Sequence, residues 1–254
     1  MIPLLSINNL TVAVGEKILV DRVSFDVPKA KIVAIAGGSG SGKTTIALSI
    51  LRLLASPLRM TQGSILFEGQ DLLGLSAESM RRCRGDRIGM VFQEPLSTFD
   101  PLFTVGEQID EVLAVHTKLS KQERYKKVLE TLSEVELSDP PRAYKSYPHQ
   151  LSGGMRQRAM VAQAIVARPS LIIADEPTSS LDVTLQVKIM ELLARLRSKN
   201  MSILLIAHDL GMIAHLADEV IILRQGKMVE KGPVSKVITE PHHEYTKALI
   251  EAFQ

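Results

Sequence analysis

The sequence has little cysteine and almost no net charge. Cys83 is the only cysteine among 254 residues, so no disulfide can form within the chain. One thiol also cannot hold an iron–sulfur cluster or a structural zinc ion, and it suits a reducing cytoplasm. Lys and Arg together number 30 against 28 for Asp and Glu. This balance lacks the basic excess of a nucleic-acid-binding protein, so we expect no nucleic-acid partner.

Long apolar runs are also missing. Runs such as residues 32–36 and 203–207 are far too short to cross a bilayer. The first residues show no basic start followed by a long apolar core, so we expect no signal peptide. Any role at a membrane is therefore expected to be peripheral.

Short runs rich in Val and Ile alternate with helical patterns. Nearly continuous apolar residues at 31–36, 171–174, 202–206 and 219–223 predict strands buried on both faces. Between the second and third of these lies a helix with one apolar face. Such alternation predicts an α/β fold, a mostly parallel sheet flanked by helices. The apolar face of that helix consists of Leu185, Ile189, Leu192, Leu193 and Leu196.

Two segments depart from this alternation. Residues 94–167 are mostly helical in pattern, with a capping box from Ser120 to Glu123 ahead of the stripe Tyr125, Val128, Leu129 and Leu132. We predict an inserted helical subdomain over 94–167 and a core over 1–93 and 168–254, together one domain. The N-terminal part of the core alternates like antiparallel strands, a β subdomain, with apolar positions at Ile7, Leu10, Val12, Ile18, Val23, Phe25 and Val27.

A phosphate-binding loop follows the strand at 31–36 and opens a helical run. Glycines let the backbone curl so that successive N–H groups face phosphate oxygens at the positive end of a helix. Lys43 supplies a positive charge for the β- and γ-phosphates, and Thr44 offers a hydroxyl to Mg²⁺. A flexible glycine turn is the bland alternative. The loop consists of Gly37, Gly38, Ser39, Gly40, Ser41, Gly42, Lys43 and Thr44, with Thr45 adjacent.

Two acids end the strand at 171–174. Asp175 lies at the carboxyl edge of the sheet, where α/β proteins bind ligands, and is the natural second contact to Mg²⁺. Glu176 follows and is suited to polarise the attacking water. Taken alone, the pair before Pro177 could be a solvated turn. The upstream phosphate loop favours the catalytic interpretation.

Residues 151–158, Leu-Ser-Gly-Gly-Met-Arg-Gln-Arg, resemble the signature motif of ABC transporter ATP-binding cassettes. The order of the other elements also resembles that family. Gln93 lies at the Q-loop position, residues 180–182 (Ser-Leu-Asp) resemble the D-loop, and His208 resembles the switch histidine. The resemblance implies an ATPase with Mg²⁺, whose Gln93 reaches the metal and water and whose His208 contacts the γ-phosphate.

The resemblance also implies a second anion site. Ser152 at a helix start, followed by Gly153 and Gly154, presents bare N–H groups. The resemblance implies that this site binds the γ-phosphate held by a partner cassette, and that Asp182 of the D-loop is also a nucleotide-binding residue. Two cassettes, identical or paralogous, are thus expected to enclose two ATP molecules. One departure is Val14, which occupies the position where many cassettes stack an aromatic ring on adenine, so we expect relaxed base selectivity.

Within the family, the chain is most similar to the ATPases of peptide and nickel importers. Residues 147–158, 98–109, 207–232 and 241–246 carry this likeness. It implies permease partners, an extracytoplasmic solute-binding protein acting indirectly, and a place at the cytoplasmic face of a bacterial inner membrane. The chain ends at Gln254 without the cysteine-bearing extension of many peptide members, which tilts the expectation mildly towards nickel or metal chelates. We interpret the adjacent His242 and His243 as surface or packing residues.

Three alternatives agree less well with the sequence. A DNA-repair ABC ATPase would insert long coiled coils between the loop and the signature, and only short helical patterns occur there. A translation-type factor would carry two cassettes. A catalytically dead cassette conflicts with the presence of Lys43, Gln93, Asp175, Glu176 and His208. An ABC importer for another solute stays open.

Overall fold

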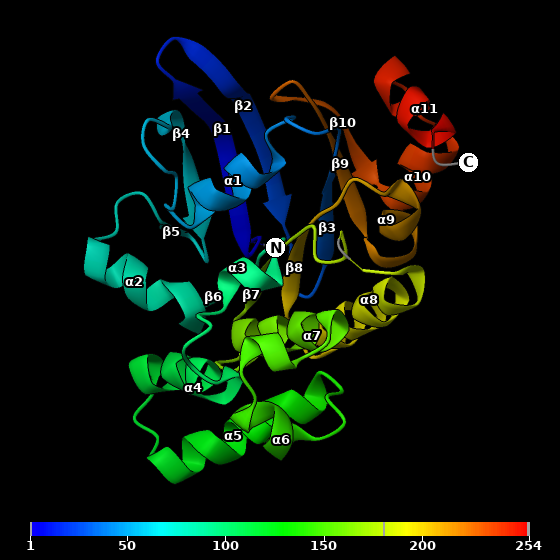
Figure 1. Cartoon of the computed structure of the whole chain (residues 1–254). Coiled ribbons are helices and arrows are strands. Elements are labelled where there is room, and N and C mark those ends of the chain that lie inside the picture. The colour runs from blue at the N-terminus through cyan, green and yellow to red at the C-terminus, as the bar shows by residue number, and fades with distance from the viewer. Residues whose placement is uncertain (1, 180, 253–254) are drawn as a thin grey trace. The chain divides into compact units, whose positions relative to one another are not determined.

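The computed structural model describes residues 2–179 and 181–252, which form two compact units. One unit comprises residues 1–80 and 197–254 and the other residues 81–196, so the boundaries lie within helices α2 (Ala77–Asp86) and α8 (Val183–Ser198). Figure 1 shows the elements of each unit. The predicted subdomain boundaries at 94 and 167 stay a prediction.

The first unit holds an antiparallel sheet in the order β2-β1-β4-β5. Its strands are β1 (Leu5–Val14), β2 (Lys17–Val27), β4 (Arg59–Phe67) and β5 (Gln70–Asp71). The predicted antiparallel N-terminal strands are present, with buried residues such as Ile7 and Phe25. Ile18 departs from the expected pattern because it is 53% exposed, next to a register shift between Val12 and Ala13. Such an irregularity turns a side chain to the other face of the sheet.

The same unit contains the strands β10 (Lys227–Pro233), β9 (Glu219–Arg224), β3 (Ile32–Ala36) and β8 (Ser202–Ile206), paired in that order. β3 runs parallel to both β8 and β9, and β10 is antiparallel to β9. β3 and β8 are completely buried, as their continuous apolar sequences predict. The helices of this unit are α1 (Lys43–Ile50), α9 (Leu210–Leu216), α10 (Val234–Thr239) and α11 (Glu244–Glu251).

Asp218 fastens two of these strands at their starts. Its carboxylate accepts hydrogen bonds from Ile32 N and Lys31 Nζ, each at 2.9 Å. Burial alone would raise the pKa of the Asp218 carboxyl, but these donors outweigh it and hold the pKa below the ordinary aspartate value. The carboxylate therefore stabilises the folded state while it is ionised.

The second unit pairs β6 (Ile88–Val91) in parallel with β7 (Leu171–Asp175). Its helices are α3 (Pro95–Thr98), α4 (Val105–His116), α5 (Lys121–Glu134), α6 (Pro140–Lys145), a 3₁₀ turn η1 (Pro148–Gln150), α7 (Gly153–Ile165) and most of α8. The apolar face predicted for α8 is buried at Ile189, Leu192, Leu193 and Leu196, whereas Leu185 is half-buried.

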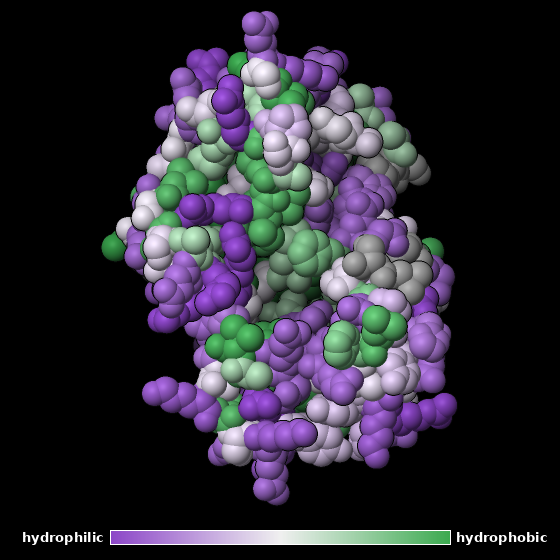
Figure 2. Space-filling model, turned by 60° about the vertical axis from the view of Figure 1, so that its left-hand side comes forward, coloured by the Kyte–Doolittle hydropathy of each residue, from purple (hydrophilic) through white to green (hydrophobic). Residues whose placement is uncertain are grey.

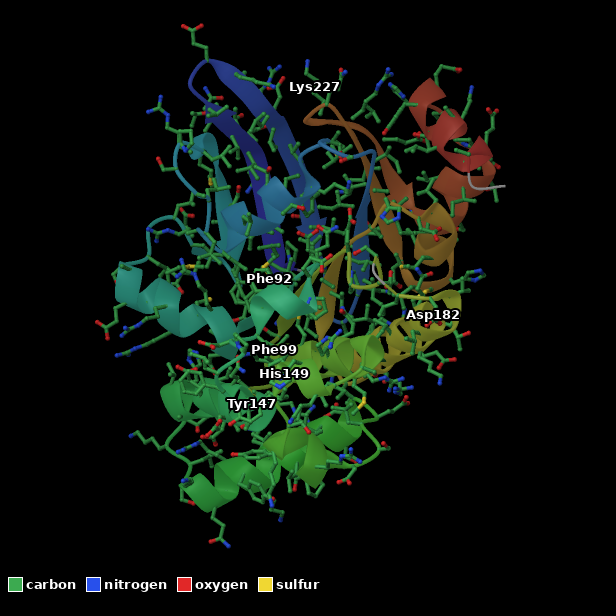
Figure 3. All side chains as sticks on the ribbon, in the orientation of Figure 1. Phe92, Phe99, Tyr147, His149, Asp182 and Lys227 are labelled. Atoms are coloured by element: carbon green, nitrogen blue, oxygen red, sulfur yellow. The ribbon has the colours of Figure 1, made fainter. Side chains whose placement is uncertain are left out.

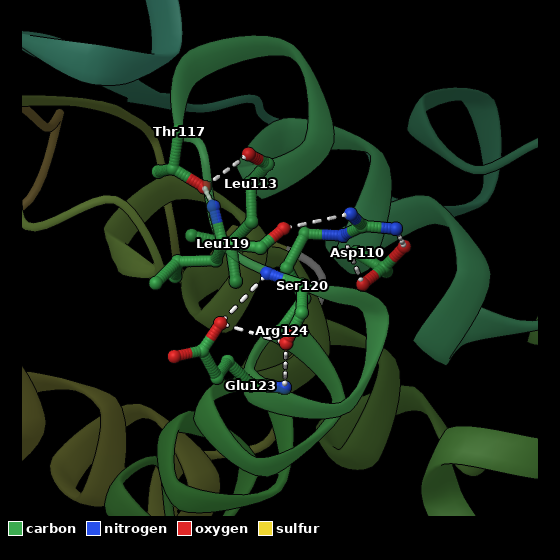
Figure 4. A network of polar contacts seen from close by, with 7 residues as sticks. All are labelled: Asp110, Leu113, Thr117, Leu119, Ser120, Glu123 and Arg124. Atoms are coloured by element: carbon green, nitrogen blue, oxygen red, sulfur yellow. Dashed lines mark hydrogen bonds and ion pairs between the residues drawn. The ribbon is translucent and has the colours of Figure 1, made fainter.

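A polar network joins α4 to α5 (Figure 4). The predicted capping box is confirmed, because Ser120 Oγ accepts from Glu123 N and Glu123 Oε2 accepts from Ser120 N at 2.7 Å. Arg124 in the first turn of α5 donates to both carboxylate oxygens of Asp110, at 2.9 and 3.1 Å. This forked pair fixes the angle between two helices. Tyr125 of the predicted stripe is 37% exposed and packs its ring against Tyr144.

The predicted fold class, an α/β core with an antiparallel β part and a helical part, is confirmed. Over the residues that the structure describes, none of the helices combines the length and apolarity needed to span a bilayer.

Candidate functional site

The predicted phosphate loop joins β3 to α1, with the first helical residue at Lys43. Lys43 is only 6% exposed, and its ammonium bends back over the loop. Its Nζ donates to Gly37 O at 2.8 Å and to Gly38 O at 3.1 Å. The loop is thus closed by its own lysine, and α1 begins with N–H groups that have no intrahelical acceptor.

Glycine is required in this loop because other backbone lies close to it. A Cβ on Gly37 would lie 2.2 Å from Leu223 O at the end of β9, and Gly42 has a φ of +101°. The turn after β9 holds the loop as well, since Gly226 N donates to Ser41 O at 3.0 Å. Ser41 Oγ is buried and has no hydrogen-bond partner among the described residues. A buried hydroxyl without a partner is expected to take one when a ligand fills the loop.

His208 lies at the same sheet edge as the phosphate loop. It follows β8 by two residues, and the parallel register pairs Ile35 of β3 with Ile206 of β8. The His208 side chain is exposed, and the next residue, Asp209, caps α9 by accepting from Met212 N at 3.1 Å. Val14, the predicted adenine position, is the half-buried last residue of β1.

The structure brings Gln93, Asp175 and Glu176 together in the second unit. The register pairs Val91 with Ala174, so the residues after β6 and β7 emerge at one edge. Gln93 Nε2 donates to Glu176 Oε2 at 3.1 Å. Asp175 is 3% exposed at the end of β7. Glu176 has a left-handed backbone with φ of +44°, an uncommon conformation for a residue other than glycine that is often found at functional sites.

The signature residues form a helix start. Ser152 is the N-cap of α7, and its Oγ accepts from Met155 N at 3.3 Å. Ser152 and Gly153 are exposed, whereas Gly154 is buried against Leu185, which a Cβ on Gly154 would meet at 2.9 Å. The exposed end of α7 thus offers the N–H groups of its first residues to an anion.

Asp182 also caps a helix. It lies at the start of α8 (Figure 3), where its Oδ1 accepts from Leu185 N at 3.0 Å. Leu185 therefore links the D-loop to the signature helix through Gly154. Ser180, the first residue of the predicted D-loop, lies outside the described residues.

The sequence did not predict a role for the side chain of Gln157. This side chain of α7 is 1% exposed, and its Nε2 donates to Pro177 O at 2.6 Å. Pro177 directly follows Glu176, so the signature helix fastens the loop that carries the predicted base. Within the described residues, Gln157 Oε1 is buried without a hydrogen-bond partner. Its position within the signature motif at 151–158 was the sequence signal.

The donor chemistry of the predicted metal ligands fits Mg²⁺. Thr44, Gln93 and Asp175 offer a hydroxyl, an amide and a carboxylate oxygen, the hard donors that Mg²⁺ prefers. The described residues contain no group of three or more His, Cys, Asp or Glu side chains that could hold a metal. A single buried carboxylate suits Mg²⁺ that arrives with nucleotide phosphates rather than in a protein cage.

A strand, a glycine loop closed by lysine and a helix define a P-loop nucleotide-binding protein. The ABC transporter family matches residues 20–179. The chain is 46% identical to the peptidoglycan transport ATP-binding protein YejF of Agrobacterium fabrum, over 98% of this chain and 47% of that protein. It is 43% identical to the dipeptide transport ATP-binding protein DppD of Haemophilus influenzae, over 98% of this chain and 77% of that protein. The chain therefore spans about half the length of the first relative.

Solved structures agree. The dimeric ATP-binding cassette MJ0796, in a post-hydrolysis state bound to ADP and Pi, matches with a TM-score of 0.80 and 30% identity, over 91% of this chain and 98% of that one. CbiO1 of Clostridium perfringens shares the fold, with a TM-score of 0.82 at 24% identity, over 94% of this chain and 91% of that one. This chain belongs to the ABC transporter family, which confirms the resemblance seen in the signature motif.

Proposed function

We propose that this chain is the ATP-binding and ATP-hydrolysing subunit of an ABC importer that takes up peptides or peptide-containing solutes. The observation that carries the proposal is the glycine loop closed by the buried ammonium of Lys43. It offers N–H donors and a positive charge to a triphosphate in one small volume.

The phosphate-loop residues bind ATP. Lys43 exchanges its contacts with loop carbonyls for contacts with the β- and γ-phosphates, and Ser41 Oγ gains a partner. Thr44 lies exposed in the first turn of α1, where its hydroxyl would bind Mg²⁺, and Thr45 follows it. When bound, Mg²⁺ supplies charge neutralisation to the phosphates.

Glu176 is the general base for the attacking water, and Gln93 keeps its carboxylate in place. Gln93 Nε2 donates to Glu176 Oε2 at 3.1 Å, which orients the carboxylate that is to accept a proton from the water. Asp175 holds Mg²⁺ at the end of β7, and His208 orients the γ-phosphate. Gln93 also begins the segment that leads into the helical subdomain. A movement of Gln93 on ligand binding can therefore be transmitted to that subdomain.

Two copies, or this chain and a paralogue, enclose two ATP molecules. The N–H groups of Gly153 and Gly154, which follow the N-cap residue Ser152, receive the γ-phosphate held by the partner's loop. Asp182 lies at the same interface. The related cassette MJ0796, which is dimeric with ADP and Pi, supports this assembly.

A permease binds to the helical subdomain, for which we propose residues 94–167. Phe99 is buried, but Leu102 and Phe103 are 78% and 53% exposed in the loop before α4. Gln108 fixes this loop, since its amide group accepts from Asp100 N and donates to Asp100 O, both at 2.9 Å. A rigid loop that exposes two apolar side chains is suited to bind the apolar face of a permease helix. Figure 2 shows hydrophobic patches among hydrophilic side chains on one face.

The names of the relatives favour peptides over nickel. Both are named for transport of peptide-containing solutes, and the nickel or metal-chelate expectation gains no support from them. A solute-binding protein outside the membrane would select the solute, and the chain would lie at the cytoplasmic face of the membrane beside its permease. The DNA-repair and translation alternatives gain no support either.

Nucleotide binding tests the first part. Lys43→Ala is expected to abolish tight ATP binding by calorimetry, because the loop loses its only ammonium for the phosphates. Wild-type affinity in that variant would refute the site.

Transport tests the second part. In vesicles that contain the whole importer, Leu102→Asp is expected to reduce ATP-driven dipeptide uptake strongly. Val115→Asp, which changes another exposed apolar residue at the far end of α4, 62% exposed, is the matched control and should not reduce uptake. Equal uptake by both variants would refute the permease surface, and nickel uptake without peptide uptake would refute the solute class.

A further inference from the structure

The second residue of the phosphate loop is held by the C-terminal part of the chain. Gly38 N donates a hydrogen bond of 2.9 Å to the phenolic oxygen of Tyr245, 207 positions away in the sequence. Tyr245 lies in the first turn of α11. A Cβ on Gly38 would lie 3.2 Å from the same oxygen, so glycine permits this close approach.

Tyr245 is itself fixed from several sides. His243 Nδ1 accepts from Tyr245 N at 3.0 Å, which caps α11. The Arg224 guanidinium lies 5.1 Å from the centroid of the Tyr245 ring, close enough for a cation–π interaction. Glu230 of β10 holds the preceding backbone, because its carboxylate accepts from His242 N at 2.9 Å and from His243 N at 3.1 Å. These contacts present the hydroxyl to the loop at a defined position.

The peptide groups of Gly38 are thus bound in two directions. Its N–H is directed to Tyr245, and its carbonyl accepts from Lys43 Nζ at 3.1 Å. Because the Gly38 N–H is engaged by Tyr245, it does not serve as a phosphate donor while this bond exists. The hydroxyl therefore acts on the shape of the loop and on the carbonyl that Lys43 contacts, rather than on the nucleotide directly.

We propose that Tyr245 is a positioning residue of the nucleotide site, which holds the start of the phosphate loop in the conformation that places the Lys43 ammonium. The inference rests on the proposed role of this loop in ATP binding. Residues 241–246 thus contribute to nucleotide affinity although they lie outside the loop and the signature. Preorganising the loop lowers the cost of ordering it when ATP binds.

The test compares nucleotide binding and ATPase kinetics of variants that differ by one group. Tyr245→Phe removes only the hydroxyl and keeps the ring beside Arg224. The loss of one neutral hydrogen bond predicts a rise of roughly 3- to 10-fold in KM and in the Kd for ATP, with kcat within about twofold of wild type. The amide of Gly38 is expected to exchange its hydrogen faster in this variant.

Tyr125→Phe is the matched control, because it also removes one tyrosine hydroxyl. The ring of Tyr125 packs on Tyr144 in the second unit and not on the phosphate loop. This variant should leave KM and Kd unchanged. Glu230→Gln keeps Tyr245 but weakens the support of residues 242 and 243, and it should raise Kd by less than Tyr245→Phe does.

The outcomes separate this inference from the proposed function. Lys43→Ala with wild-type ATP affinity would refute the phosphate site itself. Loss of ATP binding in Lys43→Ala, together with unchanged KM and Kd in Tyr245→Phe, would overturn the role of Tyr245 alone. Tighter ATP binding in Tyr245→Phe would also overturn it, since the hydroxyl would then compete with the nucleotide. A fall in kcat at constant KM would do the same.

Discussion

Gln157 gives the sharpest prediction, because a hydrogen bond of its side chain connects the signature helix to the loop of the catalytic base. The amide donates to Pro177 O at 2.6 Å, next to Glu176, and the side chain is 1% exposed. Replacing Gln157 with Leu keeps a side chain of similar size and removes the donor. The substitution therefore removes the hydrogen bond to the loop that carries Glu176, while the core remains filled.

The effect on stability follows from two opposing terms. Leaving Pro177 O buried without its partner costs about 1–3 kcal/mol. The same substitution removes Gln157 Oε1, which is buried without a partner among the described residues and carries a penalty of similar size. The free energy of unfolding should therefore change by no more than about 1 kcal/mol. Gln157→Glu keeps the shape but buries a carboxylate against a carbonyl, and it should destabilise the fold by several kcal/mol, on the order of 3–5.

Activity should respond differently from stability. With the loop released, Glu176 is less often in position, and a misplaced catalytic group costs roughly 10- to 100-fold in kcat. KM for ATP should stay within about twofold, since no phosphate-loop contact changes. Phosphate release measures kcat, and urea unfolding measures stability. Gln163→Leu, a second glutamine of α7 that does not contact Pro177, is the control and should keep wild-type kcat.

Two results would refute this reasoning. A folded Gln157→Leu variant with wild-type kcat would show that the bond to Pro177 does not position the base. A loss of clearly more than about 1 kcal/mol of stability would show that the buried Oε1 carries no penalty of the expected size.

Three further predictions concern the phosphate loop, the carboxylate of Asp218 and the binding of adenine at position 14. Gly37→Ala places a Cβ 2.2 Å from Leu223 O, so it should abolish ATP binding measured by calorimetry. Asp218→Asn should lower the stability of the fold at neutral pH. The difference from wild type should shrink as the pH falls below about 4 through the lowered pKa of Asp218, as followed by urea unfolding at several pH values. Val14→Tyr adds a ring where adenine is expected, and it should tighten ATP binding by roughly 5- to 100-fold relative to wild type in competition binding.

Each of these predictions has a contrary outcome. ATP binding by Gly37→Ala would show that the loop can shift away from β9. A stability difference for Asp218→Asn that is independent of pH would exclude the carboxylate charge as its cause. Wild-type protein that already binds ATP far more tightly than GTP would contradict the relaxed base selectivity expected from Val14.

The elements that were predicted well are those fixed by local sequence. β8 begins and ends at the expected residues because a continuous apolar run leaves no other place for it. The capping box at Ser120 needs only neighbours three residues apart. Ile18 was placed wrongly because a register irregularity between paired strands is not visible in one strand's pattern.

The site shows the same division. The phosphate loop and the acids after β7 could be located because strand ends and glycine spacing place them. The bond from Gln157 to Pro177 and the bond from Gly38 to Tyr245 join residues 20 and 207 positions apart. Only tertiary packing brings such residues together, so no local sequence pattern predicts these two hydrogen bonds.

The most direct test of the account is the mass of the Glu176→Gln variant with Mg²⁺ and ATP, measured by light scattering. Removing the base leaves binding intact, so the account predicts a stable ATP-dependent dimer. Adding Ser152→Glu places a negative charge at the helix start that receives the partner's γ-phosphate, and the protein should then stay monomeric. A double variant that still dimerises with ATP, or a single variant that dimerises neither with itself nor with a paralogous cassette, would contradict the claim that nucleotide is held between the loop of one cassette and the signature helix of another.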